Sequence, residues 1–147
     1  MGRGRAAALA AWLVLTGCAM PSSGTAEVPP ELVGTTWQAE TIAGQPVLAG
    51  VVSTVSFAAS DRIAGSGGCN RYGGALRREG GRLQVGPLVS TRMACAPEVM
   101  AQEDRFLAAI EAAERFRREG ARLFLDSTGS AEPSRFRPFV PAETPPG

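Results

Sequence analysis

The sequence predicts a mainly β protein of the β-rich α+β class, with antiparallel strands and one packed α-helix. Gly (18) and Pro (11) are frequent among its 147 residues, which indicates many tight turns. Several segments alternate apolar and polar residues with the period of a half-buried strand, whereas one stretch after Pro97 has helical spacing. A chain of this length has room for one domain with short appendages.

Residues 1–17 predict an export signal. Arg3 and Arg5 precede the apolar run 6–15, which is too short to span a bilayer. The run leads into LTGC, ending at Cys18, which resembles the lipobox of bacterial lipoproteins. The resemblance implies cleavage before Cys18 and lipidation of its sulfur and new N-terminus, and several acyl chains on one residue anchor a protein stably. The alternative is an ordinary secretory signal whose cysteine is incidental.

Residues 18–30 predict a flexible tether, because they are rich in Ser, Gly and Pro and have little to bury. The residue after Cys18 is Ala19. An aspartate at this position would resemble a signal that retains lipoproteins in the inner membrane, and the chain lacks it. We therefore expect a lipid-anchored protein of the bacterial cell envelope. If the cell has two membranes, the expected location is the outer membrane, facing the periplasm.

The domain itself is expected over residues 31–140, with a disordered, proline-rich tail at 141–147. Strand alternation begins at 35–42, where Trp37 is expected as a core anchor, the alternative being a ligand-stacking ring. Further strands are expected at 51–58 and 63–67. The last of these consists of small residues, so another element can approach its backbone closely.

Two hairpins are predicted from a duplicated segment. RREGGRLQV at 77–85 recurs as RREGARLFL at 117–125, with glycine at each turn and apolar residues at alternating inward positions. One interpretation makes Arg77, Arg78, Arg117 and Arg118 a single anion-binding patch. The other makes them solvated side chains beside two similar turns.

Residues 88–95 predict a strand with one apolar face, and Pro97 suits the first position of a helix that ends near Ala113. An apolar stripe is formed by Val99, Phe106, Leu107 and Ile110. Near the helix start, where the dipole favours acids, lie Glu98, Glu103 and Asp104. The last strand, 135–139, contains Pro138, which suggests a sheet edge.

The cysteine count predicts a disulfide. Of the three cysteines, Cys18 is assigned to lipid, which leaves Cys69 and Cys95 in an exported, oxidising setting. Closing this loop would stabilise the fold by ~3.5 kcal/mol in the chain-entropy estimate. A redox-active or metal-binding pair is the alternative, although the sequence has no Cys-x-x-Cys motif and no histidine partner.

Composition excludes whole classes of chemistry. The chain has no histidine, which excludes Ser-His-Asp and Cys-His catalysis and the usual histidine metal sites. All 15 basic residues are arginine, so Schiff-base lysine chemistry is excluded as well. The net charge of +1 gives no field that would attract nucleic acid. We expect no enzymatic activity, catalytic residue, metal or cofactor.

The segments GGCNRYGG (67–74) and LVSTRMAC (88–95), with a Gly-Thr-x-Trp opening at Gly34, resemble the signature of the META domain of HslJ-like bacterial lipoproteins. The resemblance covers about residues 32–139. It implies a compact antiparallel fold, a partly open barrel with one packed helix. It brings no established reaction or cofactor, and it ties the chain to envelope and stress phenotypes.

The two signature segments suggest a weak candidate binding site. If the disulfide draws them together, a small polar cluster could bind a carboxylate or peptide; its members are Asn70, Arg71, Tyr72, Ser90, Thr91 and Arg92. The alternative is that these side chains satisfy turn backbone in a buried polar network.

Two functions are therefore considered. The first is a non-catalytic, membrane-anchored envelope lipoprotein, a monomer that binds an envelope protein or peptidoglycan or helps maintain the envelope under stress. The second is a small-ligand-binding β scaffold in the same compartment.

Overall fold

The computed structural model describes Met1 and residues 28–141. The predicted signal segment, Cys18 and all but the last residues of the predicted tether lie outside the described residues. The predicted tail lies outside them from residue 142 onward. Everything below concerns the described domain.

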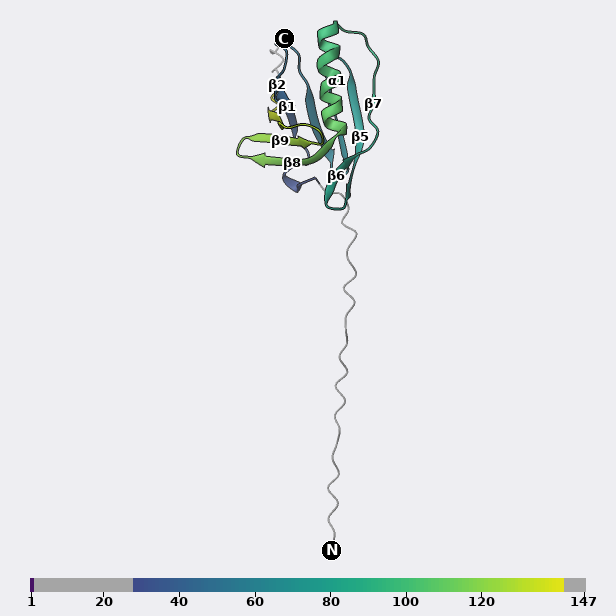
Figure 1. Ribbon diagram of the computed structural model, residues 1–147, viewed down its shortest axis with the longest axis vertical. Coiled ribbons are helices and arrows are strands. Elements are labelled where there is room, and N and C mark those ends of the chain that lie inside the picture. The colour runs from purple at the N-terminus through teal and green to yellow at the C-terminus, as the bar shows by residue number, and fades with distance from the viewer. Residues whose placement is uncertain (2–27, 142–147) are drawn as a thin grey trace, which may run out of the picture.

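Antiparallel strands dominate the domain, and one α-helix interrupts them (Figure 1). The elements are η1 (Pro30–Leu32), β1 (Thr36–Ile42), β2 (Gln45–Pro46), β3 (Thr54–Ala59), β4 (Arg62–Ser66), β5 (Arg71–Glu79), β6 (Arg82–Val85), β7 (Val89–Ser90), α1 (Pro97–Glu111), β8 (Ala113–Glu119), β9 (Arg122–Ser127) and β10 (Ser134–Pro138). The main sheet runs in the order β6-β5-β4-β3-β1-β10-β9-β8, while β2 pairs with β1 and β7 pairs with β5.

The sheet curls into a partly open barrel. Its two end strands, β6 and β8, lie against each other, yet no hydrogen-bonded pairing joins them in the part of the chain that the structure describes. In Figure 1 the β8–β9 hairpin projects to the left and the β5–β6 turn points downward, so the two duplicated hairpins flank this seam. The predicted barrel-like fold with one helix is confirmed.

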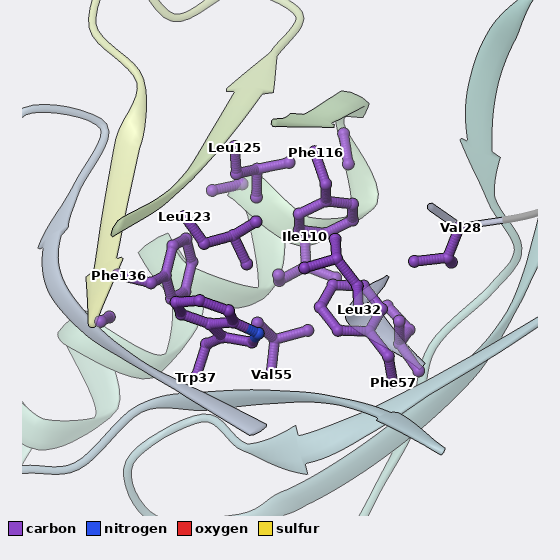
Figure 2. Packing of buried hydrophobic residues seen from close by; sticks show 14 of the residues in the cluster. Val28, Leu32, Trp37, Val55, Phe57, Ile110, Phe116, Leu123, Leu125 and Phe136 are labelled. Carbon is purple, nitrogen blue, oxygen red and sulfur yellow. The ribbon is translucent and has the colours of Figure 1, made fainter. Parts of the chain in front are cut away.

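Alternating strand residues build the core, as the period-two pattern predicts. Figure 2 shows these apolar side chains gathered in one cluster. The rings of Phe57 and Phe116 meet edge to face at 4.9 Å between centroids, and Phe106 meets both Tyr72 and Phe136 edge to face. Trp37 is buried, as expected of a core anchor, and its indole N–H donates to the hydroxyl of Thr35 at 2.8 Å.

Helix α1 begins at Pro97, as predicted, and packs against β1, β6 and β9. Phe106, Ala109 and Ile110 are buried on its inner face, and so are the polar residues Gln102 and Glu103. The helix therefore brings two polar side chains into the interior. None of the helices among the described residues has the length and apolar character needed to cross a membrane.

The prediction of a strand over 88–95 is wrong for most of its length. Within this segment only the two residues of β7 form a strand, which pairs with β5, and the residues that follow are irregular. The reason is a competing partner: the side chain of Asn70 accepts a hydrogen bond from the Met93 backbone N–H at 2.6 Å and donates to the Met93 carbonyl at 3.3 Å. A side chain therefore takes the backbone groups that a strand ladder would otherwise use.

The prediction that Pro138 marks a sheet edge is also wrong. β10 lies between β1 and β9. Pro138 is the last residue of its strand, opposite Trp37, and the next residue, Phe139, donates its N–H to the Thr36 carbonyl at 2.9 Å. A proline at the end of a strand removes no donor from the middle of the ladder.

Candidate functional site

The structure joins Cys69 and Cys95 in a disulfide, with 6.1 Å between their Cα atoms. Cys69 belongs to the glycine-rich turn between β4 and β5, and Cys95 precedes α1. The bond thus holds the two signature segments of the sequence together at the start of the helix.

Glu103 of α1 forms the centre of this region. One carboxylate oxygen accepts the backbone N–H groups of Cys69 at 2.9 Å and of Asn70 at 2.6 Å. The other oxygen accepts the Asn70 side-chain amide at 2.6 Å. The carboxylate therefore lies inside the fold, where it bonds specific donors, a role that the expected interaction with the helix dipole did not include.

The environment of Glu103 holds it in the ionised form. Burial alone would raise the pKa of the Glu103 carboxyl. Hydrogen bonds from the Asn70 backbone, the Asn70 side chain and the Cys69 backbone have a larger effect in the opposite direction, so the pKa is lowered. Gly67 makes room for this carboxylate, because a Cβ there would lie 2.6 Å from Cγ of Glu103.

Asn70 connects Glu103 to the segment before the helix. Besides Met93, its side-chain oxygen accepts the hydroxyl of Thr91 at 3.0 Å. That hydroxyl oxygen in turn accepts the Arg71 backbone N–H at 3.1 Å. Asn70 is only 3% exposed, so its polar groups are used within the protein.

A second polar chain starts at Gln102. Its amide donates to the hydroxyl of Ser53 at 3.1 Å, and Ser53 donates to the Gly67 carbonyl at 2.7 Å. The Gln102 side-chain oxygen accepts the Leu48 backbone N–H at 2.6 Å. Sequence reasoning missed Ser53, Gln102 and the inward role of Glu103. Helical spacing could have predicted that Gln102 and Glu103 face inward, because they lie three or four positions from the apolar residues Val99 and Phe106.

The candidate polar cluster divides into two groups. Asn70 and Tyr72 are buried, and the Tyr72 hydroxyl donates to the Thr54 carbonyl at 2.9 Å, where burial raises the pKa of the phenol. The other members are exposed at the surface: Arg71, Ser90, Thr91 and Arg92. The structure therefore brings the two segments together but does not point all of these side chains at one ligand.

The arginines of the duplicated segment do not form one patch. Arg117 pairs with Asp126 and Glu119, while Arg118 lies over the Trp37 ring at 5.8 Å. Burial raises the pKa of the Asp126 carboxyl, but hydrogen bonds and charge from Arg115 and Arg117 outweigh it and lower the pKa. Two of the four arginines are thus engaged separately, Arg117 within the β8–β9 hairpin and Arg118 against a residue of β1.

A cavity of about 450 Å³ opens at the barrel seam, between the two hairpins. We call it the seam cavity; it is lined by Val28, Pro29, Arg78, Gly81, Arg82, Leu83, Glu114, Arg115, Phe116 and Asp126. Its lining combines buried apolar side chains with charged residues. Among the described residues, no group of three or more Cys, Asp or Glu side chains is placed to hold a metal ion.

The fold and site define a class: a small, disulfide-closed antiparallel barrel organised by one inward-facing helical carboxylate. The META domain family model matches residues 30–138, so the chain belongs to the META domain family. No curated protein matches the chain significantly.

Two solved structures share the fold. One, determined by NMR, is 23% identical with a TM-score of 0.59, and the match covers 75% of this chain and 93% of the other. The second, an NMR structure of a protein from Burkholderia xenovorans, is 23% identical with a TM-score of 0.56, over 75% of this chain and 85% of the other. These similarities establish the fold alone.

Proposed function

We propose that this protein is a non-catalytic lipoprotein of the bacterial cell envelope, anchored by lipid on Cys18, whose META domain binds an envelope protein or peptidoglycan. The observation that carries the proposal is the N-terminal pattern of arginines, apolar run and LTGC box ending at Cys18. The Cys69–Cys95 disulfide supports it, since disulfides form and persist in oxidising compartments.

The length of the chain between anchor and domain limits where the domain acts. Val28 lies ten positions after Cys18, a distance of at most about 35 Å when the chain is fully extended. An anchored META domain would therefore work close to the membrane surface, within reach of peptidoglycan and neighbouring envelope proteins. A role in envelope maintenance under stress fits this position.

The polar network supports a binding role without catalysis. Glu103, Asn70 and Gln102 are hydrogen-bonded mainly to backbone groups of neighbouring loops. Such side chains fix the positions of the loops, and within this network no nucleophile lies beside a general base that would activate it.

Membrane fractionation tests the anchor. We expect the native protein in the membrane fraction, in the outer membrane where a cell has two, and Cys18→Ser in the soluble fraction. Cross-linking followed by mass spectrometry would then identify the partner. Equal distribution of the native protein and Cys18→Ser would contradict anchoring at this residue.

The seam cavity favours a second candidate function, a small-ligand-binding β scaffold. Its volume of about 450 Å³ falls within the range of small-molecule sites. A thermal-shift screen against envelope metabolites tests this candidate: a saturable rise in Tm supports it, and no rise with any of them contradicts it.

A further inference from the structure

We propose that the seam cavity binds an anionic amphiphile, a molecule with one apolar chain and a carboxylate or phosphate head. The inference rests on the second function proposed above and names its ligand class. It follows from the division of the cavity into an apolar floor and an arginine-bearing rim.

The floor is apolar and buried. Val28, Leu83 and Phe116 are each less than 10% exposed, and Pro29 lies beside them. They come from three separate segments, the entry to the domain, β6 and β8, which meet at the seam. An apolar chain placed against these side chains would leave water, while the polar remainder of the cavity lining stays available to a charged head group.

The rim carries cations that retain hydrogen-bonding capacity. Arg82 and Arg115 have side chains that are 70% and 69% exposed. Among the described residues, the Arg82 side chain contacts one polar partner, Glu114, at 3.3 Å across the seam, whereas a guanidinium has five N–H donors. Exposed ion pairs of this kind contribute little stability, so a ligand anion can compete for Arg82 at low cost.

The duplicated segment shows that this arrangement is specific to one hairpin. Arg82 and Arg122 occupy the same position in the two copies. Arg122 pairs with Glu40 at 2.9 Å and does not line the cavity, whereas Arg82 does. The two arginines therefore make a matched pair, equal in local sequence and different in position relative to the seam.

Calorimetric titration of the full chain carrying Cys18→Ser tests the inference, because no acyl group of its own then competes for the cavity. The probes are dodecanoate, dodecyl phosphate, dodecanol and inorganic phosphate, all below micelle concentrations. We expect one saturable site for at least one of the two anionic amphiphiles, with dodecanol and inorganic phosphate each about tenfold weaker, since neither supplies both interactions.

Variants then locate the site. We expect Arg82→Gln to weaken amphiphile binding about fivefold and Arg122→Gln to leave it unchanged. Glu114→Gln should strengthen binding, because it releases Arg82 and removes a nearby negative charge. Binding of dodecanoate alone would identify a fatty-acid-like ligand, and binding of dodecyl phosphate alone a phospholipid-like one.

Three results would overturn the inference: no saturable binding of either anion, dodecanol binding as tightly as the anions, or equal effects of Arg82→Gln and Arg122→Gln. If another compound in the thermal-shift screen raised the Tm, the small-ligand function would still be supported, with a ligand of a different class. Unchanged Tm values of the variants would establish that altered binding does not reflect unfolding.

Discussion

At the scale of single residues, Glu103 determines how the signature turn sits on the helix. Its carboxylate is buried and accepts three N–H donors from two consecutive residues, Cys69 and Asn70. Hydrogen bonds to an ionised acceptor are the stronger kind, and a buried donor left without a partner is costly. The residue thus acts as a structural acceptor at the centre of the signature.

We predict that Glu103→Gln lowers the free energy of unfolding by about 2 kcal/mol. Either orientation of the new amide turns an NH₂ group toward a backbone or side-chain N–H, so at least one hydrogen bond is lost. Urea unfolding measures the change. Glu98→Gln, exposed in the first turn of the same helix, is the control and should change the free energy of unfolding little. Equal effects of the two variants would contradict the role of Glu103.

The lowered pKa of Glu103 gives the stability a predictable pH dependence. In the unfolded chain this carboxyl has its ordinary pKa of 4.5, and in the folded protein the pKa is lower. The unfolded state therefore binds more protons between the two values, so the stabilisation is complete above 4.5 and is lost as pH falls through the folded pKa.

We predict that the difference in unfolding free energy between wild type and Glu103→Gln shrinks as the pH falls from about 6 to about 3. Asp126 adds to acid sensitivity in the same direction, but equally in both proteins. Urea unfolding at a series of pH values measures the difference. A gap that stays constant down to the lowest pH would show that Glu103 is not the titrating group.

The sequence could predict that Asn70 belongs to a polar network, but it could not predict that Glu103 is its partner. Asn70 and Glu103 are 33 positions apart, and nothing local distinguishes an inward Glu103 from an ordinary acid in the first half of a helix. The disulfide could be predicted because so few cysteines leave a single internal pairing. The other network residues depend on tertiary contacts that carry no local signal.

At the scale of elements, strand periodicity and glycine turns predicted most strands and both hairpins. The two wrong predictions, the strand over 88–95 and the sheet edge at Pro138, have one cause in common. In each case a partner distant in the sequence determined the local structure. Asn70 took the backbone of Met93 out of the predicted strand, and β1 paired with β10 so that Pro138 ended an interior strand. Local pattern does not reveal either partner.

The low bulk of β4 predicted a close backbone approach, and Gly65 is the place where it occurs. A Cβ at Gly65 would lie 2.1 Å from the backbone oxygen of Thr54 in β3. We predict that Gly65→Ala lowers the free energy of unfolding by about 3 kcal/mol, because backbone must shift to accommodate it. Chemical denaturation of the purified variant measures the loss.

Gly73 is the matched control for Gly65. It lies on β5 opposite Ala64, the residue before Gly65 on β4. A Cβ at Gly73 meets only the Ile63 carbonyl, at the ordinary distance of 3.6 Å. Gly73→Ala should therefore cost much less than Gly65→Ala. Similar losses in both variants would show that close approach does not set the requirement for glycine at position 65.

The disulfide links the β4–β5 turn to the start of α1. We predict that the double variant Cys69→Ser, Cys95→Ser loses about 3 kcal/mol of unfolding free energy, because the open chain gains freedom when it unfolds. Denaturant unfolding of both proteins under non-reducing conditions gives the value. Cys18→Ser is the control, and an unchanged midpoint in the double variant would contradict a stabilising bond.

At the scale of the whole molecule, the described strands form a continuous hydrogen-bonded order from β6 to β8, and the barrel is open at the seam between these two end strands. Val28, the first residue after the undescribed segment, lines the cavity there. The chain from the proposed anchor thus enters the domain beside the seam cavity. An anchored protein would hold that opening near the membrane, where anionic amphiphiles are abundant.

The most direct test of the account is the intact mass of the native protein, purified from bacterial membranes without reductant. We predict a chain that begins at Cys18, carries acyl groups on that residue, and is lighter by two hydrogens than the reduced form because Cys69 and Cys95 are bonded. An acyl-free chain that retains residues 1–17 and has both internal thiols open to alkylation would contradict it.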